Sequence, residues 1–244
     1  MFWFWDPTMI IVLPAILLAL FAQLRVQSTY ARYSQVPISN GLTGAAVAAE
    51  ILRRNGLSID TARQAGAPAG SYSSVQIERI NGVLSDHYDP RTRTLSLSSD
   101  VYDGASVAAV GVAAHETGHA IQHAREYAPL ALRSAMVPTV QFGSWLAWPI
   151  FLLGLWFHSG TMLQLGILVF TAFVAFTVVT LPVEFDASAR ALRALREEGL
   201  VTTDELRGVR SVLTAAALTY VAAAATAILE LARMLLLANM RREE

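Results

Sequence analysis

Four long apolar stretches constrain the fold of this chain more than any other feature. They run from Met9 to Ala22, Pro138 to Phe157, Met162 to Val183 and Val212 to Met240. The second and third each have about the 20 residues needed to cross a bilayer core. The first follows aromatic residues suited to a membrane interface and lacks a small-residue cleavage site, which predicts an uncleaved anchor. The last contains Glu230 and Arg233, which leaves open whether it spans.

Composition and charge also favour a membrane protein. Hydrophobic residues make up 54% of the chain and charged residues 15%, which is unusual for a soluble protein. A net charge of −1 gives no basic surface for nucleic acid. Arginines follow the first and third stretches, whereas the turn around His158 has no positive charge. By the positive-inside rule the N-terminus lies outside, although Arg241 and Arg242 conflict with this if the last stretch spans.

Residues His115-Glu-Thr-Gly-His119 form an HExxH motif in a run of small apolar residues that predicts a helix. Histidines four residues apart lie on one helix face, with Cβ atoms about 5–6 Å apart, so both can bind one Zn²⁺. Zinc lowers the pKa of a bound water from about 15.7 to near 7, and Glu116 beside it can take the proton. The alternative is a helix with two hydrogen-bonded histidines and a surface glutamate. Burying such ionisable groups without a metal or a charge partner is costly.

The third ligand has to come from elsewhere in the chain. His123 continues the spacing of four, but at 1.5 Å rise per residue it lies about 12 Å from His115, so we expect it to pack behind the ligands. Glu184 follows the uncharged stretch that ends at Val183 and would complete a His/His/Glu site with one open position. Its alternative role is a carboxylate near a helix N-terminus after Pro182. Paired with the HExxH helix, the ligand role is favoured.

Four segments together carry a family resemblance: Gly41-Leu-Thr-Gly44, Asp86-His-Tyr-Asp-Pro-Arg-Thr92, His115-Glu-Thr-Gly-His-Ala-Ile-Gln-His123 and Leu181-Pro-Val-Glu-Phe-Asp-Ala-Ser188. They resemble the neutral zinc metallopeptidases of the YugP type, which are bacterial membrane-embedded proteins. The resemblance runs over nearly the whole chain. It implies a gluzincin-like catalytic core, similar in plan to the heat-shock protease HtpX and the CAAX prenyl proteases. It also implies His115, His119 and Glu184 as zinc ligands and Glu116 as the general base.

One position departs from the wider gluzincin pattern. Those relatives place an Asp four residues after the ligand Glu, where it can orient a zinc histidine, and this chain has Ser188 there. The nearby acid, Asp186, lies two residues after Glu184. Because a helix turns about 200° over two residues, Asp186 would face away from Glu184 and can pair with Arg190 at i+4. The sequence leaves open which groups orient the ligand histidines.

The polar middle of the chain predicts a compact α+β unit. Thr43 is a suitable N-cap for a helix from Gly44 to Asn55, and Gly56 is well placed at its end. Residues 75–80 and 94–98 alternate as short strands. A strand before an HExxH helix can receive an extended substrate by edge pairing. We assign that role to Thr94–Ser98 and a covering role to 75–80.

Two further polar residues are candidates for the site. His87 can bind substrate, and Tyr220 can donate a hydrogen bond to the oxyanion of a tetrahedral intermediate. A histidine in a turn and a tyrosine on an Ala-rich helix serve equally well in packing. We favour a structural role for both.

The predicted fold is a mainly helical α+β membrane protein with a zincin-like catalytic core, a small β-sheet and three to four transmembrane helices. Four regions are expected along the chain. They are an N-terminal anchor at 1–33, a catalytic region at 34–133, a transmembrane hairpin at 134–183 and a third-ligand and Ala-rich helical region at 184–244.

The predicted function is zinc-dependent cleavage of protein or peptide substrates at the bacterial cell membrane, with the site on the cytoplasmic side of the lipid bilayer. One alternative is a membrane scaffold or regulatory subunit with structural zinc. A structural site is closed by a fourth protein ligand, so metal binding by His87 or His123 would favour the scaffold. Another alternative is a zinc hydrolase that acts on a non-peptide bond. The sequence predicts neither a particular substrate nor an oligomeric state.

Overall fold

Residues 7–60, 74–82 and 85–240 are described by the structure, a computed structural model of the chain. They divide into two compact units, each assembled from separated segments. The helical unit comprises Met1–Leu24, Ala131–Pro182 and Leu218–Glu244, and the α/β unit comprises Arg25–Leu130 and Val183–Ala217. Three long helices, α1 (Met9–Ser34), α6 (Gly160–Glu197) and α7 (Thr203–Met240), contribute residues to both units.

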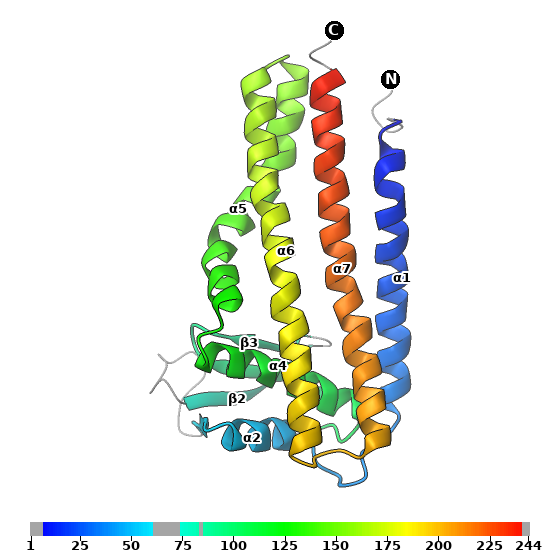
Figure 1. Ribbon diagram of the computed structural model, residues 1–244, viewed down its shortest axis with the longest axis vertical. Coiled ribbons are helices and arrows are strands. Elements are labelled where there is room, and N and C mark those ends of the chain that lie inside the picture. Colours follow the sequence, from blue (N-terminus) through cyan, green and yellow to red (C-terminus); the bar gives the residue numbers. More distant parts are fainter. Residues whose placement is uncertain (1–6, 61–73, 83–84, 241–244) are drawn as a thin grey trace. The chain divides into compact units, whose positions relative to one another are not determined.

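The helices α1, α6 and α7 are each long and apolar enough to cross a membrane (Figure 1). A fourth helix, α5 (Ala128–Trp156), bends by 50° between Val140 and Trp145. It counts as a membrane span only if its two halves are taken together as one broken span. The three to four membrane helices predicted from the sequence are therefore confirmed by length and composition. In the region of the predicted hairpin α5 is followed by α6, and His158 between them adopts a φ of 53°.

The helical unit has its own apolar interior, to which α5, α6 and α7 contribute. Glycines allow α5 and α6 to approach closely, because a Cβ atom at Gly166 would lie 2.8 Å from the Cβ atom of Phe151. Small residues at helix contacts are typical of packing in membranes. The buried residues of this interior are Ala147, Phe151, Leu163, Phe170, Met234 and Ala238.

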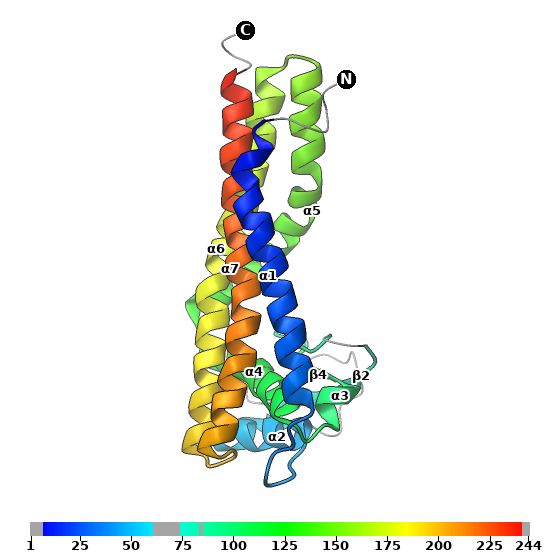
Figure 2. The same cartoon turned by 90° about the vertical axis from the view of Figure 1, so that its right-hand side faces the viewer.

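One charged side chain of α7 is held inside the helical unit by three partners. Nε of Arg233 donates to Oγ1 of Thr8 at 3.1 Å, next to the start of α1, and the two helices run side by side (Figure 2). Its guanidinium also pairs with Glu230 at 3.4 Å and lies over the ring of Trp148 at 5.5 Å. Charges in apolar helices are costly unless paired. Since both charges of this stretch are paired, α7 remains a candidate span.

The α/β unit contains a four-stranded sheet with the strand order β1-β2-β4-β3. Its strands are β1 (Ser58–Ile59), β2 (Ser74–Ile80), β3 (His87–Asp89) and β4 (Thr94–Ser98). β2 runs parallel to both β1 and β4, whereas β3 runs antiparallel to β4 with Tyr88 opposite Leu95. The two strands predicted from sequence alternation are therefore present as β2 and β4.

The role assigned to Thr94–Ser98 as a substrate-receiving edge is wrong. β4 is paired on both sides, to β2 and to β3, and all five of its residues are buried. A strand that is hydrogen-bonded on both sides offers no row of free backbone groups to a peptide. The outer strands of the described sheet are β1 and β3, and β3 is the one that lies beside β4.

Helix α2 (Gly44–Arg54) begins at the predicted residue and ends one residue before the predicted Asn55, which is its C-cap. Oγ1 of Thr43 accepts a hydrogen bond from the backbone N of Ala46 at 3.2 Å, and Gly56 beyond the helix adopts a φ of 79°. A side chain at Gly44 would overlap the carbonyl oxygen of Val101 in the short helix α3 (Ser99–Tyr102). These close contacts let α2 pack against α4 (Val107–Ala124), the helix that carries the HExxH motif.

Candidate metal centre

Helix α4 is fixed in the interior of the α/β unit. Its N-cap is Ser106, whose Oγ accepts a hydrogen bond from the backbone N of Ala109 at 3.2 Å. The residues before the motif are small and apolar, and Val110, Ala113 and Ala114 are buried in the core with residues of α2, β4, α6 and α7. The motif therefore lies on a helix that is held from several sides.

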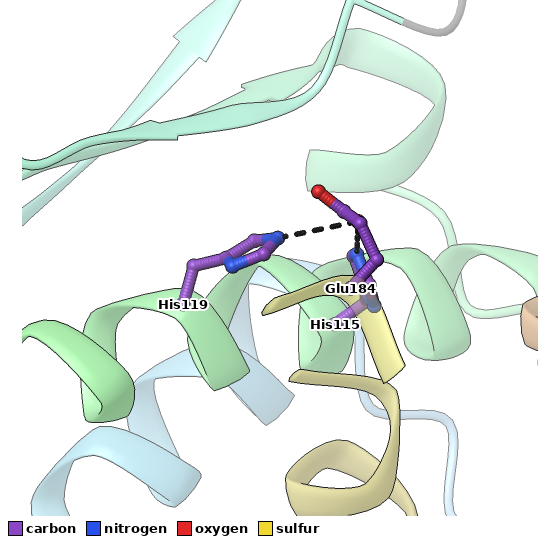
Figure 3. A group of neighbouring side chains, drawn as sticks. All are labelled: His115, His119 and Glu184. Atoms are coloured by element: carbon purple, nitrogen blue, oxygen red, sulfur yellow. Dashed lines mark hydrogen bonds and ion pairs between the residues drawn. The ribbon is translucent and has the colours of Figure 1, made fainter. Parts of the chain in front are cut away.

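The structure brings the three predicted ligands together (Figure 3). His115 and His119 extend from α4, and Glu184 extends from α6. Oε2 of Glu184 lies 3.2 Å from Nε2 of His115 and 3.6 Å from Nε2 of His119. Glu184 is only 2% exposed and His119 is buried, whereas His115 is partly exposed. The cluster is therefore buried but reachable beside His115.

This donor set fits a zinc ion. Two ligand atoms at about 2.0–2.1 Å from a tetrahedral zinc are about 3.3–3.4 Å apart, and the contacts of 3.2 and 3.6 Å lie on either side of that value. The ligand atoms all lie within 4.8 Å of one another, and the group consists of these three residues in the part of the chain that the structure describes. Three protein ligands leave one tetrahedral position open, as in catalytic zinc sites.

Glu116 follows the first ligand on α4 and is partly exposed. Burial raises the pKa of its carboxyl above the ordinary value. The two ligand histidines oppose this rise, whereas the charges of Glu184 and Asp86 add to it. A carboxyl with a raised pKa is better matched to proton transfer near neutral pH than an ordinary glutamate.

The pKa of His119 is also raised. Burial alone lowers it, but the hydrogen bond to Glu184 and the negative charge of Glu116 outweigh that effect. Because a ligand imidazole has to be neutral, metal and proton compete for this side chain.

Ser188 contacts the first ligand. Its Oγ lies 3.1 Å from Nδ1 of His115, on the side of the ring away from Glu184. Ser188 lies four residues after Glu184 on α6, and its hydroxyl makes the contact with the histidine.

Gln122 contacts the second ligand, a contact that sequence reasoning missed. Its side chain is fully buried, and its Oε1 lies 3.0 Å from Nδ1 of His119. Its Nε2 donates to the carbonyl of Val183 and to Oδ2 of Asp186, both at 2.8 Å. Asp186 also pairs with Arg190 at 2.6 Å, as the i+4 spacing predicts. The available signal is spacing, since Gln122 lies three residues after His119 on the same helix face.

Gly118 allows α6 to approach the motif. A Cβ atom at this position would lie 2.5 Å from the carbonyl oxygen of Ala187 and 3.1 Å from its Cα. The third ligand, Glu184, lies one turn earlier on α6 than this crossing. The glycine inside the HExxH motif therefore lets the backbone of α6 come close enough to bring Glu184 to the histidines.

We expect Gly118→Ala to displace α6 and to weaken both folding and metal binding. The added methyl group meets backbone, which cannot rotate away, and such overpacking costs about 1–3 kcal/mol. Thermal unfolding in detergent should shift down by several degrees, and zinc content should fall. The matched control is Gly111→Ala on the same helix, where the nearest atom is a methyl group of Val209 at 3.2 Å. Equal effects of the two substitutions would contradict a special role for the Gly118 crossing.

The remaining candidates are two histidines with other hydrogen-bond partners and a tyrosine of the helical unit. Nδ1 of His123 lies 2.9 Å from the hydroxyl of Tyr88, so this histidine links α4 to β3. His87 is exposed on β3, with its Nδ1 2.8 Å from the carbonyl of Ser85. Tyr220 lies on α7 in the helical unit. Neither His123 nor His87 belongs to the metal-binding group found among the described residues.

Comparisons with known proteins point in the same direction. Residues 8–239 match the family described as "Putative neutral zinc metallopeptidase". The chain is 42% identical over 234 residues to "Putative membrane protease YugP" of Bacillus subtilis (strain 168), which covers 96% of this chain and 97% of that protein. No solved structure matches the chain.

Proposed function

This chain belongs to the neutral zinc metallopeptidase family, and on that premise we propose that it is a membrane-embedded endopeptidase whose zinc is held by His115, His119 and Glu184. One observation carries the proposal. Ligand atoms from two helices, separated by more than 60 positions in the sequence, lie within 4.8 Å of one another. A His/His/Glu set with one open position is the form that peptidases of the thermolysin type use.

The residues around the metal would divide the chemistry between them. Zinc, when bound, polarises a carbonyl oxygen and makes water more acidic. Glu116 accepts the proton of the attacking water and passes it to the leaving amine. Its raised pKa suits both steps, because the same carboxyl has to take up a proton and then release it.

The free edge of β3 is the proposed place for the substrate main chain. Tyr88 of β3 contacts His123, which lies one turn after the second ligand on α4, so this strand runs close to the ligand helix. Figure 3 shows sheet strands that pass above the side chain of His119. Main-chain pairing with an exposed strand holds a peptide largely independently of its side chains. This arrangement would suit a peptidase of broad specificity.

We place the zinc close to a membrane surface, on the cytoplasmic side. Glu184 follows directly on the uncharged part of α6 that ends at Val183, and the first basic residue after it is Arg190. Arginines also follow the apolar part of α1, which by the positive-inside rule puts these helix ends in the cytoplasm. Membrane proteins, or their exposed termini, are then the substrates with the best access.

The alternative functions receive less support. A structural zinc would need a fourth protein ligand, and neither His87 nor His123 joins the three-residue group in the described part of the chain. The family match favours a peptide bond over another carbonyl substrate.

Metal removal tests the proposal. We expect the detergent-purified protein to hold about one zinc per chain and to cleave an unfolded model protein. Removing the zinc with a chelator should abolish cleavage, and adding zinc back should restore it. Undiminished cleavage by protein that contains no metal would contradict the proposal.

A further inference from the structure

We propose that Gln122 is a positioning residue that holds His119 for the metal through a chain of hydrogen bonds from Arg190 and Asp186 on α6. The inference rests on the proposed zinc site. It concerns residues that do not touch the metal or the substrate.

The orientation of the Gln122 amide is determined by its partners. The carbonyl of Val183 can only accept a hydrogen bond, and so can the carboxylate of Asp186. Both lie 2.8 Å from Nε2 of Gln122, which uses the two protons of that amide nitrogen. The amide oxygen must then be the atom that faces His119, at 3.0 Å.

This orientation selects one tautomer of His119. An amide oxygen can only accept, so Nδ1 of His119 carries the proton and donates it to Gln122. In the neutral ring Nε2 then carries the lone pair that a metal would use, on the side of the ring that faces Glu184, 3.6 Å away. Partners of this kind fix both the tautomer and the ring orientation of a metal-binding histidine.

The chain of contacts extends from Gln122 to a fixed point on α6. Asp186 is held by Nε of Arg190 at 2.6 Å, and the Arg190 guanidinium lies over the ring of Tyr127 at 5.7 Å. The side chains of Arg190 and Asp186 are 17% and 30% exposed, so this ion pair is partly shielded from water. Because Glu184 lies on the same helix as Asp186 and Arg190, α6 supplies one ligand directly and orients another through Gln122.

His115 has a different kind of partner. A serine hydroxyl can donate or accept, so the 3.1 Å contact with Ser188 selects neither tautomer of His115. The two ligand histidines therefore have different kinds of partner, and of these two contacts the one between Gln122 and His119 selects a tautomer.

A double-mutant cycle on zinc affinity tests the inference, with affinity measured in detergent by competition with a chelator. We expect Gln122→Met, which keeps the side-chain volume but removes the acceptor, to weaken zinc binding about 10–100-fold. Asp186→Ala should weaken it less, because the bond from Gln122 to Val183 remains. In the Gln122→Met background Asp186→Ala should change the affinity by no more than about twofold, since its path to His119 is gone. Asp186→Asn keeps an acceptor and should retain most of the affinity.

The control separates positioning from general stability. Thr117 is fully buried on α4, and its hydroxyl donates to the carbonyl of Ala113 at 2.7 Å. Thr117→Val also removes one buried hydrogen bond at constant volume, and it should leave zinc affinity unchanged. Thermal unfolding of the zinc-free proteins should not rank the variants in the order of their affinities. If Asp186→Ala lowered the zinc affinity equally in the wild-type protein and in Gln122→Met, the inference would be overturned. Absence of zinc from the wild-type protein would instead overturn the proposed site itself.

Discussion

Replacing Glu116 by glutamine is expected to reduce the turnover number for an unfolded model protein by at least about 100-fold, since general bases contribute about 10²–10⁴-fold to rate. Zinc content should stay at the wild-type level, because Glu116 is absent from the ligand group. The amide has nearly the same shape as the carboxyl but cannot accept a proton at neutral pH. The measurement is turnover and bound zinc on the same preparation.

The control for this substitution is Glu126→Gln, which makes the same chemical change at an exposed position just beyond α4. Its turnover should match that of the wild type. Full turnover of Glu116→Gln with a full complement of zinc would contradict the role of general base. Loss of zinc together with turnover would instead indicate that Glu116 supports the ligand helix.

Features set by local sequence were predicted well. Membrane helices follow from long apolar stretches, and α2 follows from Thr43 at one end and Gly56 at the other, because each signal lies within the element that it determines. The HExxH spacing predicts that two imidazoles share a helix face for the same reason. The proximity of Glu184 to the two histidines could be predicted only by pairing two distant segments, and the HExxH motif indicated which segment to pair with it.

Features set by contacts between segments were not predicted. Alternation identified β4 as a strand but did not reveal that β2 and β3 pair with it on either side, so the substrate edge was assigned to the wrong strand. The contact of Gln122 with His119 depends on where α6 places Val183 and Asp186, which no local pattern encodes. The requirement for glycine at position 118 also depends on α6, because a side chain there would collide with the backbone of Ala187.

Removing the third ligand is the second substitution with a large expected effect. Glu184→Ala leaves two histidines to hold the metal, and we expect bound zinc to fall below about a tenth of the wild-type level, because catalytic zinc sites use three protein ligands. Cleavage should fall below detection with it. The measurement is zinc per chain after dialysis against a weak chelator, followed by the cleavage assay.

A second variant distinguishes loss of a ligand from loss of the fold. Glu184→Gln keeps the size of this buried side chain and one oxygen near the histidines, but it removes the negative charge, so its zinc content should lie between those of the wild type and Glu184→Ala. In zinc-free protein the buried Glu184 pairs with His115 at 3.2 Å, so both substitutions remove this pair and should lower the unfolding temperature to a similar extent. If Glu184 is a ligand, the zinc-free forms of the two variants should unfold at similar temperatures, while Glu184→Gln retains more zinc than Glu184→Ala. Full zinc content and full cleavage activity in Glu184→Ala would show that Glu184 is not a ligand and that α6 does not bind the metal through this residue.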